Sequence, residues 1–357
     1  MPGFVSVIFG ILLFSILIFV HELGHFLTAK AFGVQVNEFS MFMGPAIFKK
    51  KKGETLYTIR CIPIGGFCAM EGEDQDTDNP RSFQKAAWWK RMIILVAGAA
   101  MNFIIGIVFF AIVYAPIQEI STPVFTKFDD CCIFNGEGGL QVGDEVVSID
   151  GERVYTASNV SLLLSINPTG THDIVVLRDG QKISFDDFSM AHTCVDESGN
   201  EYTHYGIYMG QGQEATFGRK LKAIWYTTLD NARTVRLSLQ MLLSGKVGLA
   251  DMAGPVGIVN MMSDAASTAP SFWDALLNLI YFGGFLAVNL GIMNLLPIPA
   301  LDGGRVLALL LTTAVEAVTK KKIDPKYEGY IHAVGMILLL GLMALIMFKD
   351  IFTIFKG

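Results

Sequence analysis

The chain has 357 residues, of which 52% are hydrophobic and 17% charged, and its mean hydropathy is +0.46. An average soluble domain is about 45–50% apolar and about 25% charged, so this composition excludes an ordinary soluble protein. The formal net charge of −6 gives no reason to expect a nucleic acid as a partner.

Four segments without a charged residue are each long enough to supply the roughly 20 residues that cross a hydrocarbon core. They are Met1–Val20, Met92–Gln118, Ala275–Leu301 and Gly329–Phe348. They predict a polytopic α-helical membrane protein with four transmembrane helices. The first segment has neither a basic n-region nor a small-residue cleavage signal, so we expect a retained helix rather than a signal peptide.

The first apolar segment runs directly into the sequence His21-Glu22-Leu23-Gly24-His25. Positions i and i+4 share one face of a helix, so His21 and His25 can bind the same metal ion. Glu22 then lies beside the metal, where it can take a proton from a water molecule. HExxH also occurs by chance, but ionisable residues at membrane depth are costly and mark functional sites. The motif therefore indicates a metal-dependent hydrolase that works inside the bilayer.

The next stretch, Val34–Phe67, predicts extended chain. Its segment Glu54–Ile62 alternates and is rich in β-forming residues, and prolines and glycines interrupt the stretch. We expect two to four short strands. They form either a small membrane-associated sheet near the active site or a plain hairpin in the cytoplasm, and the residues leave both interpretations open.

A small β domain is predicted for Ser121–Gln213. A turn and strand at Gly139–Gly151 precede a helix at Val154–Ser165 and a hairpin at Thr171–Phe185. This order resembles a PDZ domain, which binds extended peptide ends by adding a strand to its sheet. The alternative is another small β domain in which the Gly-Asp turn is structural.

An amphipathic helix is predicted for Phe217–Leu243, with apolar residues on one broad face and basic residues on the others. Such a helix lies in the membrane interface or packs on the β domain, and the residues leave both possibilities open.

The distribution of Lys and Arg predicts the orientation in the membrane, because cytoplasmic loops carry an excess of basic residues. The loops between the first two and the last two apolar segments are basic, whereas Glu119–Asp274 contains 20 acidic and 10 basic residues. We therefore expect the two basic loops in the cytoplasm. Both termini and the β domain are then extracytoplasmic.

The five cysteines form no metal-binding pattern. Cys61 and Cys68 are expected on the reducing side of the membrane. Cys131, Cys132 and Cys194 are expected on the outside, where one of the adjacent pair could form a disulfide with Cys194.

A catalytic zinc usually has three protein ligands and an open fourth position, so two histidines are too few. The best third ligand is Asp302, in the stretch Asn294-Leu-Leu-Pro-Ile-Pro-Ala-Leu-Asp302-Gly. Its two prolines end the third apolar helix, so a carboxylate can turn inward where irregular backbone lines a polar cavity. The orientation argument puts this stretch on the same side as the HExxH motif. The amide of Asn294 is placed to bind a substrate carbonyl or oxyanion.

Together these motifs resemble those of bacterial site-2 proteases of the RseP type, which are intramembrane zinc metalloproteases, and the resemblance covers nearly the whole chain. The strongest matches are to the family's HExxH and NxxPxPxLDG motifs. Weaker matches are Gly98–Asn102 to a GxxxN element, Ile62–Phe67 to a membrane-reentrant β segment and Gly254–Ile258 to a stretch after the PDZ part. The chain has room for one PDZ domain, whereas RseP has two.

The resemblance implies a site and a reaction. Zinc (Zn2+) would be held by His21, His25 and Asp302, with Glu22 as general base and acid and Asn294 orienting the substrate. Substrate contacts would be made by Ile62, Gly65, Gly66 and Asn102.

The implied substrates are single-span proteins of the bacterial inner membrane, such as anti-sigma factors or remnant signal peptides, cut within the bilayer. Peptide ends are possible ligands of the PDZ domain. The alternative is a non-proteolytic metal-binding scaffold that recruits peptides, but Glu22 argues against it because a structural zinc site needs no base.

The sequence thus predicts a definite order of segments. We expect transmembrane helix 1 at 1–30, a β segment and loop at 31–90, transmembrane helix 2 at 91–118, an extracytoplasmic PDZ-like domain at 119–213, an amphipathic region at 214–270, transmembrane helix 3 at 271–303, a cytoplasmic loop at 304–328 and transmembrane helix 4 at 329–357.

Overall fold

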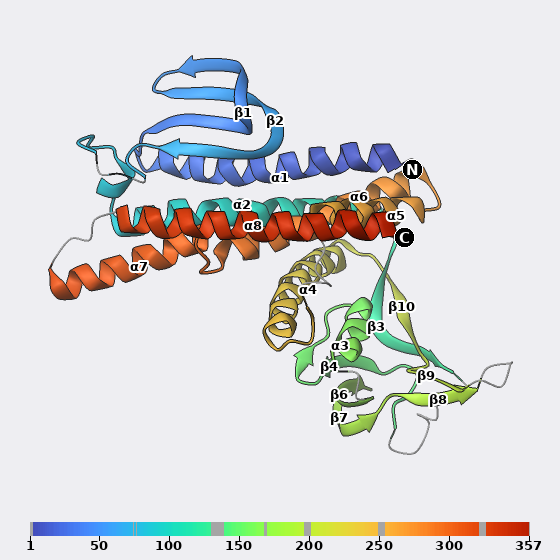
Figure 1. The fold of residues 1–357 in the computed structure, drawn as a ribbon. Coiled ribbons are helices and arrows are strands. Elements are labelled where there is room, and N and C mark those ends of the chain that lie inside the picture. The colour runs from blue at the N-terminus through green and yellow to red at the C-terminus, as the bar shows by residue number, and fades with distance from the viewer. Residues whose placement is uncertain are drawn as a thin grey trace. The chain divides into compact units, whose positions relative to one another are not determined.

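A computed structural model describes residues 3–356 except positions 74, 76, 130–138, 168–169, 196–200, 249–253 and 321–325. The chain divides into two compact units (Figure 1). Unit 1 comprises Met1–Val113 and Asn231–Gly357, and unit 2 comprises Tyr114–Asp230.

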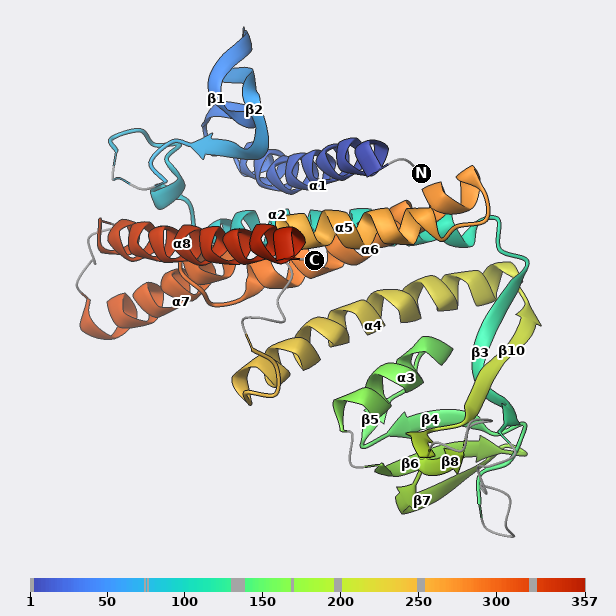
Figure 2. The ribbon, with the colours of Figure 1, turned by 45° about the vertical axis from the view of Figure 1, so that its right-hand side comes forward.

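Four of the described helices are long and apolar enough to cross a membrane, as the sequence predicts. They are α1 (Gly3–Ala31), α2 (Trp88–Tyr114), α6 (Phe272–Leu295) and α8 (Lys326–Lys356). Their axes run alongside one another in both views (Figures 1 and 2). The chain is therefore a membrane protein, and α1 continues through the HExxH motif without a break.

Small residues let α2 pack closely on its neighbours, as is common between membrane helices. A Cβ atom added to Gly24 of α1 would overlap the backbone of Ala97 in α2. A Cβ atom added to Gly106 of α2 would lie 2.9 Å from Val288 Cγ2 and 3.2 Å from the Gly284 carbonyl oxygen, both in α6. These close approaches press the HExxH turn of α1 against α2.

A shorter helix, α5 (Pro255–Ser267), packs on α1 and α6 through buried side chains that include Met262. The carboxylate of Asp350 in α8 accepts hydrogen bonds from the N–H groups of Gly254 and Gly257, at 2.9 and 3.0 Å. Helix α5 begins here, so Asp350 satisfies N–H groups that have no partner within the helix.

Helix α7 (Asp302–Thr319) occupies much of the stretch that the sequence predicts as the loop 304–328. Val306 and Leu309, three residues apart on one helix face, pack against the apolar cluster that includes Ala29 of α1 and Ile94 of α2. Packing of this face on the bundle explains why the segment folds as a helix although it is too short to span the membrane.

Strands β1 (Val36–Lys52) and β2 (Thr55–Met70) form a sheet beside α1 (Figures 1 and 2). The two strands pair twice, so that Glu38 lies opposite both Leu56 and Ala69. The sheet is therefore broader than a plain hairpin, and β2 packs against α1 along its second half, near Gly66.

Unit 2 is built on a six-stranded sheet with the order β10-β3-β4-β6-β7, in which β5 pairs with β4. Its elements are β3 (Glu119–Phe128), β4 (Glu145–Ile149), β5 (Glu152–Arg153), α3 (Ala157–Ile166), β6 (Thr171–Arg178), β7 (Gln181–Ser189), β10 (Ile207–Glu214) and the separate pair β8 (His192–Val195) and β9 (Glu201–His204). The predicted strand, helix and hairpin correspond to β4, α3 and β6–β7. A small β domain is thus present, and its assignment as a PDZ domain stays a prediction.

Helix α4 (Phe217–Leu243) has the bounds that the sequence predicts, beginning in unit 2 and ending in unit 1. Cys194 in unit 2 is disulfide-bonded, whereas Cys61 and Cys68 are free thiols. The two predicted partners of Cys194, at positions 131 and 132, lie outside the described residues.

Candidate metal centre and active site

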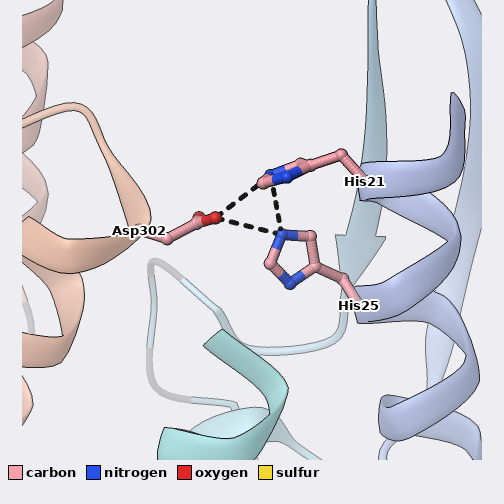
Figure 3. Close-up of side chains that lie close together, drawn as sticks. All are labelled: His21, His25 and Asp302. Atoms are coloured by element: carbon pink, nitrogen blue, oxygen red, sulfur yellow. Dashed lines mark hydrogen bonds and ion pairs between the residues drawn. The ribbon is translucent and has the colours of Figure 1, made fainter. Parts of the chain in front are cut away.

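Three side chains from distant parts of the sequence converge in unit 1 (Figure 3). His21 Nε2 and His25 Nε2 lie 3.2 Å apart, and Asp302 Oδ2 lies 3.1 and 3.3 Å from them. Among the described residues, His21, His25 and Asp302 form the one group of histidine, cysteine or acidic side chains whose atoms lie close enough together to hold a metal ion. The structure thus brings together the three residues that the sequence analysis selects as ligands.

The geometry of this group fits zinc. Ligand atoms at about 2.0–2.1 Å from a tetrahedral zinc ion lie about 3.3–3.4 Å from one another, close to all three distances here. Asp302 Oδ2 faces the Nε2 atoms of the two histidines. When both imidazoles are neutral with the proton on Nδ1, all three atoms are acceptors, and a cation between them would satisfy all three.

Local structure explains how Asp302 reaches the histidines. Helix α6 ends at Leu295, and the Pro297 and Pro299 stretch turns the chain before α7 begins at Asp302. Ala300 in this turn has a φ of 79°, and its N–H donates to His332 Nδ1 of α8 at 3.0 Å. The chain thus turns at the two prolines, as predicted, and the carboxylate lies on the first residue of a new helix, which the sequence does not predict.

Glu22 lies between the three candidate ligands and strand β2. Its carboxylate accepts a hydrogen bond from the backbone N–H of Cys68. A Cβ atom added to Gly66 would lie 3.4 Å from Glu22 Cγ and 3.1 Å from the Ser40 carbonyl oxygen. The second half of β2 thus forms a wall beside the candidate base.

The other residues selected from the sequence have different surroundings. Gly65 has a φ of 80°, and Ile62 is 46% exposed near the bend of β2. The amides of Asn294 and Asn102 both approach His21 Nδ1, at 3.4 and 3.3 Å. Asn294 is half-buried, whereas Asn102 is only 1% exposed. The roles of all four in substrate binding or orientation stay predictions.

Helix α2 contributes two features that sequence reasoning missed. The carbonyl oxygen of Ile94 lies 2.8 Å from His25 Nδ1 and is placed to accept a hydrogen bond. A Cβ atom at Gly98, one turn later, would overlap both imidazole rings. The only signal in the sequence was the GxxxN element, whose glycine is explained by this contact.

The profile of the family described as "Peptidase family M50" matches residues 9–342. The chain belongs to Peptidase family M50. Its sequence is 33% identical over 356 residues to a protein of Clostridium acetobutylicum designated a candidate zinc metalloprotease, with 98% of each chain covered. It is 29% identical over 440 aligned positions to the regulator of sigma-W protease RasP of Bacillus subtilis, covering 98% of this chain and 99% of RasP.

This M50 peptidase is therefore a zinc metalloprotease, and its membrane helices and its RasP relatives make it a zinc intramembrane protease. The family resemblance that the motifs carry is confirmed. The aligned 440 positions exceed the 357 residues of this chain, so RasP has segments without a counterpart here.

Gly98→Ala is predicted to weaken zinc binding strongly in this M50 peptidase. The added methyl group overlaps the rings of His21 and His25, which must move apart from Asp302 to make room. Zinc content after purification measures the effect. Gly341→Ala in α8 is the matched control, because a Cβ atom there meets nothing within 4 Å. Equal zinc content in the two variants would contradict the close packing of α2 on the site.

A second prediction concerns the junction of the β sheet with α1. Glu54 accepts hydrogen bonds from Lys30 at 2.5 Å and from Arg81 at 2.6 and 2.8 Å. Arg81, and then Lys30, lower the pKa of Glu54 to about 2. Its pKa in the unfolded chain is about 4.3. The stabilisation is therefore complete above about pH 4.3 and is lost as the pH falls toward about 2.

Glu54→Gln is thus expected to lower the thermal unfolding temperature at pH 7. The difference from the native chain should shrink between pH 4 and pH 2. Unfolding in detergent at these pH values measures it, and a difference that does not change with pH would refute the ion-pair explanation.

Proposed function

We propose that this M50 peptidase cuts peptide bonds within the transmembrane segments of single-span proteins, with zinc held by His21, His25 and Asp302. The observation that carries the proposal is the convergence of these three side chains at zinc-ligand spacing, with both histidines on α1, a helix long enough to cross a membrane. A protease that acts on soluble peptides would not need its metal ligands on a helix that crosses a membrane.

The residues around the site have distinct roles in this proposal. Zinc in this position supplies Lewis-acid activation of water and of the peptide carbonyl. Glu22 takes the proton from the attacking water and returns it to the leaving amine. The Cys68 N–H holds the Glu22 carboxylate in place for this transfer. Asn294 orients the substrate carbonyl or donates a hydrogen bond to its oxyanion.

A transmembrane substrate must unwind before it is cut, because the hydrogen bonds of a helix shield its peptide bonds. The second half of β2, in which Gly66 lies next to Glu22, offers a strand on which the unwound segment can pair, and Ile62 and Gly65 precede Gly66 in the same strand. Pairing would satisfy the substrate backbone and hold it extended.

The site also suggests a class of substrate. The relative in Bacillus subtilis is named "Regulator of sigma-W protease RasP", so anti-sigma factors are candidate substrates here, as are remnant signal peptides. Unit 2 would act as a PDZ-like filter that binds peptide ends and excludes substrates with intact extracytoplasmic domains. Truncating it should allow uncut substrates to enter.

The proposed location is the bacterial inner membrane, with both termini and unit 2 outside the cytoplasm. The basic loops support this orientation. The disulfide of Cys194 in unit 2 supports it independently, since disulfides persist in oxidising compartments whereas Cys61 and Cys68 are free.

Cleavage of a tagged single-span protein by the purified protein in lipid vesicles tests the proposal. Mass spectrometry of the products should place the cut bond inside the substrate's membrane segment. Gly66→Ala should slow this cleavage at least about 10-fold with zinc retained, whereas Gly341→Ala should not. The methyl group would lie 3.1 Å from the Ser40 carbonyl oxygen and 3.3 Å from Ile18 Cγ2, so it would shift the part of β2 that contacts Glu22. A cut only outside the membrane segment, or no difference between the two variants, would refute it.

A further inference from the structure

Helix α2 faces the candidate zinc ligands with three positions one turn apart. Ile94 offers its carbonyl oxygen to His25 Nδ1 at 2.8 Å, Gly98 makes room for the rings, and the Asn102 amide lies 3.3 Å from His21 Nδ1. Each imidazole therefore has its Nε2 toward Asp302 and its Nδ1 toward α2.

The chemistry of a histidine ligand requires an acceptor at this second nitrogen. A neutral imidazole that binds a metal through Nε2 carries its proton on Nδ1, and that N–H usually donates to a carboxylate, carbonyl or water. His25 has such an acceptor in the Ile94 carbonyl. His21 needs one as well, and the two side chains that approach its Nδ1 are Asn102 and Asn294.

Asn102 is suited to be this acceptor. It is only 1% exposed, and its Oδ1 is buried without a hydrogen-bond partner. A half-turn of the amide about the Cβ–Cγ bond exchanges Oδ1 and Nδ2 with almost no change of shape. The oxygen then faces the Nδ1–H group of His21.

Asn294 is the weaker acceptor for His21. Its amide is slightly farther from the ring, at 3.4 Å, and it is half-buried rather than enclosed. It is therefore free to turn toward a substrate carbonyl, which an enclosed Asn102 is not.

We infer that Asn102 is a positioning residue of the metal centre, which accepts the Nδ1–H hydrogen bond of His21 and so fixes its tautomer and ring orientation. This inference rests on the proposed zinc site of His21, His25 and Asp302. It assigns Asn102 to metal binding through His21, in place of the substrate contact that the resemblance implies.

Zinc affinity of the full-length protein, measured by competition with a chelator, tests this role. Asn102→Leu has a similar volume and no acceptor, so zinc should bind about 10–100-fold more weakly. Asn102→Asp keeps an acceptor and should bind zinc at least as tightly as the native chain. The absorption spectrum of the cobalt-substituted protein should change in the Leu variant and stay native-like in the Asp variant. Asn278→Leu is the matched control. Asn278 lies in the first half of α6, away from Asn294, and its amide donates to the carbonyl oxygen of Ala265 in α5.

Three results separate the possibilities. Unchanged zinc affinity of Asn102→Leu, with a raised KM, would overturn the inference in favour of a substrate contact. If the Leu variant does not fold, weakened zinc binding by Asn102→Asp would overturn it. His21→Ala is run in parallel. Unchanged zinc binding by His21→Ala would refute the proposed zinc site itself. If His21→Ala loses zinc while Asn102→Leu binds it as tightly as the native chain, only the role of Asn102 is refuted.

Discussion

Replacing Glu22 with glutamine is expected to lower kcat for peptide cleavage by about 10²–10⁴-fold, the usual contribution of a general acid–base group. Glutamine is nearly the same size and can still fill the space beside Gly66 and Cys68, but it cannot take a proton from water. Because Glu22 is not one of the three converging ligands, zinc should remain bound. Turnover of a single-span substrate and zinc content, measured on the same sample, check both parts.

The matched control is Glu145→Gln, an exposed glutamate of β4 that belongs to unit 2. Its activity should equal that of the native chain. Activity above a tenth of native in Glu22→Gln would rule out Glu22 as the base. Loss of zinc in that variant would instead mean that Glu22 helps to hold the site together.

Asp302→Ala is expected to lose both zinc and activity, with a fall in rate of about 1,000-fold or more, since Lewis-acid stabilisation of the transition state amounts to several kcal/mol. The variant leaves two histidines, which are too few to hold a catalytic zinc tightly. Treating the native protein with a chelator should remove its zinc and its activity in the same way. Adding zinc back should restore the activity of the native chain but not that of Asp302→Ala.

Zinc content by atomic emission and cleavage before and after chelation are the measurements. A variant that keeps one zinc per chain would show that another residue is the third ligand. Recovery of Asp302→Ala by added zinc to native rates would contradict the direct role of this carboxylate.

The sequence predicts much of the candidate site because its main determinants are local. The i, i+4 spacing of His21 and His25 fixes them on one helix face. The two prolines before Asp302 predict the end of the third apolar helix, which lets the carboxylate turn toward the histidines. Neither step needs knowledge of how the helices pack.

The sequence does not predict what depends on packing. Asn102 is assigned to substrate by resemblance, but its contact with His21 depends on how α2 is rotated about its axis. That rotation is set by the approach of Gly24 to Ala97 and of Gly98 to the imidazoles, which no spacing in the chain encodes.

The same limit applies to the sheet and to α7. Alternation of residues predicts strands in Val34–Phe67, but it does not predict that β1 pairs twice with β2 or that Gly66 reaches Glu22. The sequence predicts a loop at 304–328, because the apolar run Val306–Val315 is too short to span a membrane. Helix α7 forms there because Val306 and Leu309 pack on a core supplied by distant segments.

The most direct test of the central claim is anomalous X-ray scattering at the zinc absorption edge, from crystals of the native protein with zinc bound. The account predicts one peak within bonding distance of His21 Nε2, His25 Nε2 and a carboxylate oxygen of Asp302, with a fourth position left for water or substrate. A peak bound by other residues, or four protein ligands around the ion, would contradict it.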